Sequence, residues 1–289
     1  MHIVKSKGIL SAKNGMNLYR GCVHGCIYCD SRSDCYQMNH DFEDIEIKGN
    51  AIELLENVLR KKRKKCMIGT GCMTDPYIPL ESKLCNMRKA LELIDSYGFG
   101  VSIITKSDLI LRDLDLLKSI NEKAKCVVQI TLTTFDEDLC KKIEPNVCTT
   151  KRRAEVLNIL RDNDIPTVVW LSPILPFIND TKQNIEGILN YCIQAKVYGI
   201  VCFGMGLTLR NGNREYFYKQ LDKHFPNLSA KYKKIYGDSY VVGSKNNDEI
   251  MKYFYSECKK YGIETNIDKL FEYCRTFEEK VLCEQLTMF

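Results

Sequence analysis

The sequence predicts an α/β fold in which the strands of a parallel sheet alternate with helices. Two observations support this prediction. Short apolar runs alternate along the chain with longer segments whose apolar residues recur at helical spacing, a pattern typical of βα units. The residues that follow the apolar runs are small, polar or charged, as expected where a ligand lies at the carboxyl ends of parallel strands.

The same pattern places each element in order. In the first helix, Ile52, Leu55 and Leu59 fall on one face. Helices are expected at residues 50–65, 84–97, 111–121, 151–163 and 181–196. The apolar runs that follow them are expected as strands at 66–70, 101–105, 126–132, 167–171 and 199–203. With one more strand just before residue 21, the chain is predicted to form about six βα units between residues 14 and 206.

Six units are fewer than the eight of a closed barrel. An open, partial barrel and a doubly wound sheet are therefore both consistent with the pattern. The sequence from residue 207 onward is different, because it is helical, basic and rich in aromatic residues. We expect a βα domain over residues 1–206 and a C-terminal extension over 207–289 that caps the mouth of the barrel.

Three closely spaced cysteines form the most informative motif. Cys22, Cys26 and Cys29 have the spacing Cys-x3-Cys-x2-Cys. A structural zinc site uses four protein ligands, and a fully protein-ligated four-iron cluster uses four thiolates. Three thiols on one loop instead favour an iron–sulfur cluster with one iron open to a substrate or cofactor. A non-catalytic zinc-binding module is the alternative.

Positive charge is concentrated in two segments. The formal net charge is +5, and residues 60–65 form an unbroken basic run. Residues 210–260 hold 11 Lys or Arg against 6 Asp or Glu. Basic patches attract phosphate backbones. The alternative for residues 60–65 is the solvated carboxyl end of a helix, where cations suit the helix dipole.

The composition indicates a cytoplasmic protein. The first residues lack the apolar core of a signal peptide, and no apolar run approaches the roughly 18–20 residues of a membrane span. The 15 cysteines are expected to be mostly reduced, because a disulfide framework is typical of short secreted chains. We expect no contact with a membrane, and the sequence does not indicate an oligomeric state.

The cysteine motif, with Tyr28 before its last cysteine, resembles the signature of radical S-adenosylmethionine (SAM) enzymes. Further stretches resemble the spore photoproduct lyase-like branch, the DNA repair photolyase-type radical SAM proteins: residues 18–22, 74–77, 104–107, 173–176 and 179–180. The resemblance implies a partial (β/α)6 TIM-type barrel with a helical C-terminal extension. It also implies a [4Fe–4S] cluster that reductively cleaves SAM to a 5′-deoxyadenosyl radical for hydrogen abstraction.

The resemblance also implies roles for individual residues. Cys22, Cys26 and Cys29 would bind three irons, and the amino and carboxylate groups of SAM would bind the fourth. The residues expected to contact SAM lie at strand ends or in the cysteine loop: Tyr28, Gly69, Thr70, Gly71, Thr74, Lys106, Thr131 and Thr133. The two glycines leave backbone groups open to a ligand. Lys106 suits the carboxylate or ribose of SAM.

Cys72 is the candidate catalytic thiol. It follows the second predicted strand, where spore photoproduct lyases carry a cysteine that returns a hydrogen atom to the product radical. Met73 and Asp30 depart from the lyase pattern, so the substrate stays open. One interpretation is a nucleic acid, through DNA lesion repair or base modification; the alternative is a small molecule or peptide. An electron donor such as flavodoxin or ferredoxin is expected as a partner.

Overall fold

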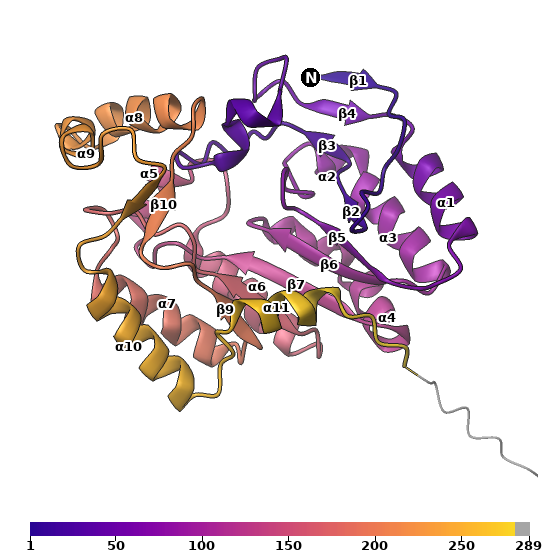
Figure 1. Ribbon diagram of the computed structural model, residues 1–289. Helices are drawn as coiled ribbons and strands as arrows, with labels where there is room; N and C mark the ends of the chain where they lie inside the picture. The colour runs from indigo at the N-terminus through magenta and orange to yellow at the C-terminus, as the bar shows by residue number, and fades with distance from the viewer. Residues whose placement is uncertain (281–289) are drawn as a thin grey trace, which may run out of the picture.

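The computed structural model describes residues 1–280 and contains a curved parallel sheet of six strands (Figure 1). The strands lie in sequence order: β2 (Gly15–Met16), β5 (Met67–Thr70), β6 (Gly100–Thr105), β7 (Cys126–Thr131), β8 (Thr167–Trp170) and β9 (Gly199–Val201). Each neighbouring pair is parallel. The spatial order never reverses, so the sheet lacks the switch point of a doubly wound fold. The predicted α/β partial barrel is confirmed.

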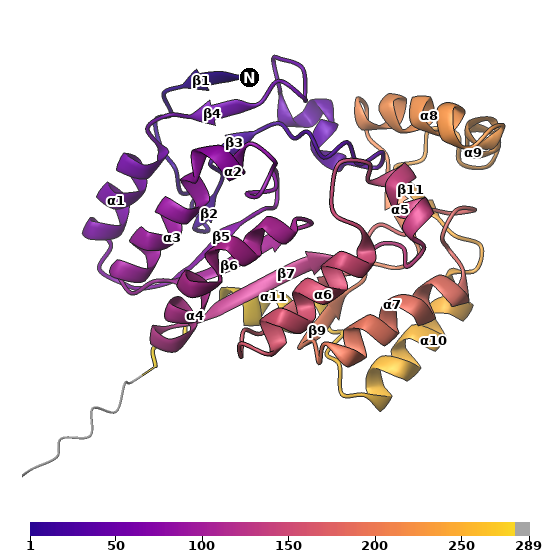
Figure 2. The same cartoon turned by 180° about the vertical axis from the view of Figure 1, so that it is seen from behind.

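Helices cover the outer face of the sheet (Figure 2). They are α1 (Ala51–Lys61), α3 (Asn86–Ser96), α4 (Leu114–Lys123), α6 (Thr150–Arg161) and α7 (Lys182–Gln194). These are the five predicted helices, with ends shifted by a few residues. The apolar faces of these helices form the main core together with strand residues such as Ile68, Val128 and Val169. Each such burial stabilises the fold by about 1.5–3 kcal/mol. None of the helices within residues 1–280 is long and apolar enough to cross a membrane.

A small N-terminal sheet lies beside the cysteine loop. Its strands are β1 (His2–Val4), β4 (Glu46–Lys48) and β3 (Tyr19–Arg20), with β4 parallel to β1 and antiparallel to β3. Strands of two or three residues are too short to show alternation, so the sequence did not predict β1 and β4. The strand expected just before residue 21 coincides with β3, whereas the first strand of the barrel is β2. The other short elements are α2 (Glu81–Leu84), α5 (Glu137–Ile143) and the 3-10 helices η1 (Asp30–Arg32), η2 (Asp34–Tyr36) and η3 (Asp108–Asp113).

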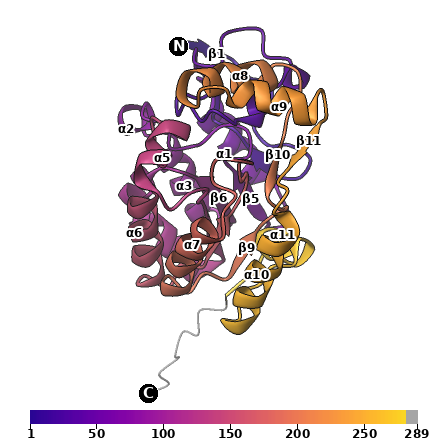
Figure 3. The same cartoon turned by 90° about the vertical axis from the view of Figure 1, so that its left-hand side faces the viewer.

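After β9 the chain returns to several parts of the barrel. β10 (Gly206–Thr208) pairs antiparallel with β11 (Val241–Gly243). Between them come α8 (Asn213–His224) and α9 (Leu228–Tyr236), which lie at the same end of the molecule as the N-terminal sheet (Figure 3). α10 (Asn247–Lys260) packs beside α7.

The last described helix, α11 (Ile267–Arg275), packs against the inner face of the sheet. Leu270 is buried there with Val127, Val168 and Val201. Because side chains alternate along a strand, these valines point away from the outer helices. Within the described part of the extension, residues 207–280, α11 thus packs inside the partial barrel, a position that the expected capping of the mouth did not include. The domain boundary after residue 206 stays a prediction.

Replacing Leu270 with alanine tests how much α11 stabilises the barrel. We expect Leu270→Ala to lower the free energy of unfolding by about 2–5 kcal/mol, because it leaves a cavity among the inner-face valines. Glu272 is exposed on the same helix, so Glu272→Ala is the matched control and should change stability by less than about 0.5 kcal/mol. Urea unfolding of both variants gives the comparison. Equal stabilities would show that α11 does not support the sheet.

Candidate active site

The cysteine loop, residues 21–29, is held in place by backbone hydrogen bonds from distant segments. Cys22 N donates to Phe42 O at 2.9 Å, and Ile27 N donates to Ile143 O at 3.0 Å. Gly21 has a φ of +86°, and a Cβ there would lie 2.5 Å from Phe42 O. Only glycine adopts this conformation without strain and permits this approach. The loop is therefore anchored at its first and central residues before any metal binds.

The three thiols of the cysteine loop are the candidate metal ligands. Cys22 and Cys26 are buried, and Cys29 is half-buried. Burial raises the pKa of the Cys22 thiol to about 12 and that of Cys26 well above its usual value. Metal binding would therefore displace protons from these thiols.

A cavity of about 890 Å³, called the central cavity below, opens at the carboxyl ends of the strands. Several predicted site residues line it: Tyr28, Cys29, Gly71, Cys72, Lys106 and Thr131. The structure thus brings together residues from the cysteine loop and the ends of β5, β6 and β7. Parallel strands place their carboxyl ends at one edge of the sheet, which explains this convergence.

Six predicted site residues do not line the central cavity: the buried thiols Cys22 and Cys26, and four others. Gly69 and Thr70 lie within β5 and pair with its neighbouring strands. Thr74 lines a separate cavity of about 400 Å³ beside the N-terminal sheet. Thr133 is fully buried, and its hydroxyl donates to Glu144 Oε1 at 3.3 Å. Strand-end position alone did not separate these residues from those that face the cavity.

Gly71 ends β5 for a steric reason. Its φ is +97°, and a Cβ would lie 2.0 Å from Ile104 O. The chain can therefore turn closely over β6 only with glycine at this position. This turn brings Cys72 to the wall of the central cavity.

Asp75 connects three segments around the site. Its carboxylate accepts hydrogen bonds from Thr105 Oγ1 at 2.7 Å and from Lys106 N at 2.8 Å. His24 Nδ1 of the cysteine loop lies 3.6 Å from Asp75 Oδ2. Burial lowers the pKa of His24, which keeps the ring neutral. Asp75 therefore fixes the backbone of Lys106 at the cavity wall. The sequence motif contained Asp75, but its pattern did not indicate this role.

A buried ion pair lies behind Tyr28 and Thr131. Glu144 and Arg153 are fully buried and bonded to each other. Arg153 Nη1 donates to Thr131 O at 2.7 Å, and the Tyr28 hydroxyl donates to Glu144. Burial raises the pKa of Glu144, but the charges of Arg153 and Lys106 outweigh burial and hold the pKa below its usual value. The sequence analysis did not identify this ion pair, because burial of one charged residue among its neighbours has no local signature.

The C-terminal extension supplies the opposite wall of the central cavity. Arg210 Nη2 donates to Tyr240 Oη at 2.9 Å, and Arg210 Nη1 lies 3.6 Å from Asp30 Oδ2. Phe203 and Tyr240 line the cavity and are 61% and 47% exposed. The Trp170 ring lies 6.1 Å from that of Phe203. We call Trp170, Phe203, Tyr240 and Arg210 the rim.

The two basic segments have different positions. Residues 60–65 lie at the end of α1 and before β5, so they are at the opposite end of the strands from the central cavity. Lys65 there packs on the Phe99 ring, 4.4 Å from its centroid. This location agrees with the helix-end interpretation. Of the second segment, Arg210 reaches the cavity.

Comparison with known protein families identifies a family model that matches this chain. A family model described as the Radical SAM superfamily matches residues 16–192, more than half of the chain. The match begins in β2 and ends within α7.

Relatives are found in bacteria, archaea and a phage. An uncharacterized protein of Mycobacterium tuberculosis is 27% identical over 241 residues, which cover 81% of this chain and 70% of that protein. An uncharacterized protein of Methanocaldococcus jannaschii is 34% identical over 176 residues, 60% of this chain and 65% of that protein. A radical SAM Nalpha-GlyT isomerase of Pseudomonas phage M6 is 23% identical and covers 54% of this chain and 32% of that protein.

Solved structures share the fold. Spore photoproduct lyase complexed with dinucleoside spore photoproduct has a TM-score of 0.63 at 12% identity and covers 90% of this chain and 78% of that chain. A mutant of the lyase with bound AdoMet and dinucleoside spore photoproduct has a TM-score of 0.61 at 12% identity and covers 84% and 72%. At this identity the likeness concerns the fold.

Substitution of Arg153, compared with substitution of its neighbour Arg152, tests how much the buried ion pair stabilises the protein. We expect Arg153→Met to lower the free energy of unfolding by about 3–5 kcal/mol, because it leaves the Glu144 charge buried without its partner. Arg152 is half-exposed and paired at the surface, so Arg152→Met should cost less than about 1 kcal/mol. Adding Glu144→Gln to Arg153→Met should recover part of the loss. Similar unfolding midpoints in urea for the two single variants would contradict this account.

Proposed function

The chain belongs to the radical SAM superfamily, and from this membership we propose that it is an enzyme that modifies or repairs a nucleic-acid base by radical chemistry. Enzymes of this superfamily use a [4Fe–4S] cluster and SAM, and this protein does so too. When bound, the two supply reductive cleavage of SAM and hydrogen abstraction from the substrate. A one-electron donor such as flavodoxin or ferredoxin is the proposed reductant.

The proposed cluster ligands are Cys22, Cys26 and Cys29. All three lie on one loop, two of them buried and one half-buried, which supports them. A structural zinc site uses four protein ligands, so three thiols favour a cluster over the alternative of a non-catalytic zinc module. Three thiolates would leave one iron available for the amino and carboxylate groups of SAM.

The proposed SAM contacts are the residues that line the central cavity beside the cysteine loop: Tyr28, Gly71, Lys106 and Thr131. Lys106 supplies a positive charge for the carboxylate of SAM, and its Nζ lies 5.8 Å from the Tyr28 ring centroid. Burial lowers the pKa of Lys106, but nearby negative groups outweigh this effect and raise it. Lys106 therefore stays charged at neutral pH.

The rim is the observation that supports a nucleic-acid substrate. Exposed aromatic rings at a cavity mouth offer faces on which bases stack, and a neighbouring arginine attracts phosphate. Phe203 and Tyr240 are the exposed rings, and Arg210 is the cation beside Tyr240. Solved proteins of the same fold hold a dinucleoside spore photoproduct. A small molecule or peptide is the alternative substrate.

Cys72 is proposed to donate a hydrogen atom to the product radical. It lines the central cavity, so its thiol is accessible to a bound substrate. Burial raises the pKa of Cys72, although Arg275 opposes this effect. The sulfur therefore keeps its proton at neutral pH, as a donor of a whole hydrogen atom must. In this step the S–H bond breaks, a C–H bond forms on the substrate, and the sulfur keeps one unpaired electron.

Hydrogen transfer from labelled substrates tests the proposed function. Anaerobically reconstituted protein with SAM and dithionite should form 5′-deoxyadenosine, whereas Cys26→Ala should form none. Deuterated DNA, RNA, nucleotides and peptides are then offered separately. We expect deuterium in 5′-deoxyadenosine with DNA or RNA. Transfer only from peptides or small metabolites would select the alternative substrate class.

Substitutions in the rim test, in the same assay, whether its aromatic rings stack on bases. Phe203→Ala and Tyr240→Ala should each raise KM for the nucleic acid by about five- to one-hundred-fold, because a stacked base is lost. Tyr255→Ala is the control, since Tyr255 is a comparably exposed aromatic residue on α10 that does not line the central cavity. Equal KM values in all three variants would exclude stacking on the rim.

The thiol step has its own test. In deuterated water, the wild-type protein should return solvent deuterium to the product through the exchangeable Cys72 thiol, and Cys72→Ala should not. Cys66 lies at the other end of the strands, so Cys66→Ala should behave as wild type. Undiminished deuterium return by Cys72→Ala would exclude this thiol as the donor.

A further inference from the structure

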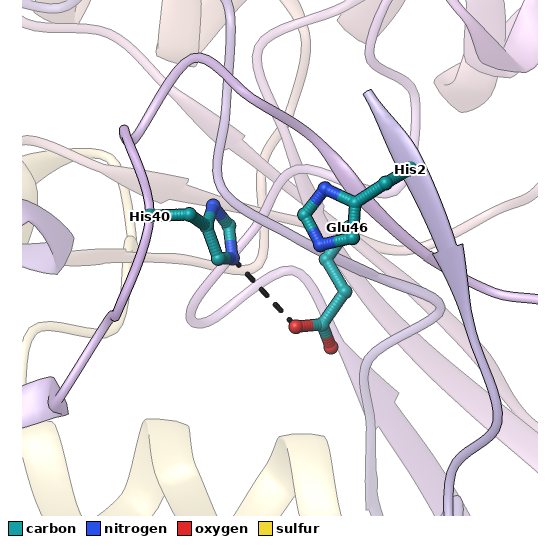
Figure 4. A group of neighbouring side chains, drawn as sticks. All are labelled: His2, His40 and Glu46. Carbon is teal, nitrogen blue, oxygen red and sulfur yellow. Dashed lines mark ion pairs between the residues drawn. The ribbon is translucent and has the colours of Figure 1, made fainter.

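Three side chains converge in the N-terminal sheet, away from the central cavity (Figure 4). They are His2, His40 and Glu46, and one ligand atom from each lies within 4.8 Å of the others. Within residues 1–280, this is the only group of three His, Cys, Asp or Glu that meets this distance. His2 of β1 and Glu46 of β4 are register partners, so the sheet itself places them side by side. His40 comes from the loop that precedes β4.

Both imidazole rings are oriented by their Nδ1 atoms. His2 Nδ1 lies 3.0 Å from Asp44 Oδ2, and His40 Nδ1 lies 3.0 Å from Asp41 O. A carboxylate and a carbonyl only accept hydrogen bonds, so each Nδ1 carries the proton. In the neutral ring, each Nε2 then has a free lone pair. Histidines that bind metal ions are typically oriented in this way by a carboxylate or a backbone carbonyl.

The His40 Nε2 atom is buried and has no hydrogen-bond partner among residues 1–280. It lies 3.6 Å from Glu46 Oε2, too far for a direct hydrogen bond. Two ligands of one tetrahedral zinc, each bound at about 2.0–2.2 Å, lie about 3.4 Å apart. The separation therefore suits two atoms that share an ion.

One cation that neighbours Glu46 in the sheet, Arg20, is held elsewhere. Arg20 of β3 is the other register partner of Glu46. Its Nη2 atom donates to Tyr36 O at 2.6 Å and to Gln37 O at 3.0 Å. The guanidinium is thus used to hold the loop after η2, and the structure shows no ion pair between it and Glu46.

We propose that His2 Nε2, His40 Nε2 and the Glu46 carboxylate bind a zinc ion. Two imidazoles and one carboxylate are a donor set that zinc accepts, whereas calcium and magnesium prefer oxygen ligands. Asp44 and the carbonyl of Asp41 orient the two rings. Three protein ligands leave one position for water.

The ion braces the segment that supports the cysteine loop. Phe42 lies between His40 and Glu46, and its carbonyl accepts the hydrogen bond from Cys22 N. Zinc joins both ends of this segment to β1. The site is therefore a positioning element for the loop, and its occupancy does not depend on the cysteines themselves.

Zinc binding to the full chain tests the proposal. The experiment uses a full-length variant in which Cys22, Cys26 and Cys29 are replaced by alanine. This variant is stripped of metal and titrated with zinc in competition with a chromophoric chelator. We expect one zinc per chain. His40→Gln or Glu46→Gln should abolish this binding, and Asp44→Ala should weaken it by about 10- to 100-fold, because the ring of His2 loses its orienting partner. His224→Gln on α8 is the control and should bind as the parent does.

Cobalt substitution distinguishes this site from the remaining cysteines. Bound cobalt should show visible d–d absorption without thiolate charge-transfer bands, and His40→Gln should lose that absorption. Circular dichroism checks that each variant is folded. Zinc binding unchanged in folded His40→Gln and Glu46→Gln, or cobalt with thiolate bands only, would overturn the proposal.

Discussion

The buried pair of Glu144 and Arg153 is the interaction on which the site depends. It takes two charges into the protein interior, at a desolvation cost that their attraction and further hydrogen bonds offset. The Tyr28 hydroxyl and the Thr131 carbonyl satisfy two of them. The residue before Glu144, Ile143, accepts the hydrogen bond from Ile27 N in the cysteine loop. One pair therefore joins the cysteine loop, the end of β7 and helix α6, so their relative positions are fixed together.

Apolar spacing accounts for the part of the fold that the sequence predicted. Leu55 recurs with other apolar residues at the spacing of one helix face, and Val128 lies in a largely apolar run typical of a strand buried on both faces. Helix α1 and strand β7 therefore follow from local pattern. The pattern left a partial barrel and a doubly wound sheet equally open, because strand order depends on contacts between distant segments. The N-terminal sheet was missed because β1 and β4 have only three residues each and pair over a long distance in the sequence. The inner position of α11 was missed because an amphipathic helix does not reveal which face of a sheet it covers.

The candidate active site, like the fold, was predicted only in part from the sequence. Motif position identified Cys29, Gly71 and Lys106, all of which line the central cavity. It did not distinguish Thr131, at the cavity wall, from Thr133, which is buried against Glu144. Both threonines follow the same alternation, and the chain leaves the strand after Thr131, so the side-chain direction changes there. The rim was beyond local analysis, since Arg210 meets Tyr240 and Asp30 only after the extension has folded back.

The inner position of α11 has a consequence for how the protein matures during synthesis. Domains fold as their segments leave the ribosome, N-terminal parts first. The six strands of the barrel emerge well before residues 267–275, so Val127, Val168 and Val201 are left without their packing partner for that interval. The wall that contains Arg210 and Tyr240 also arrives late. Cluster insertion before this point would place iron and sulfide in a site that is still open to solvent. Assembly of the cluster after the extension has folded would avoid this exposure.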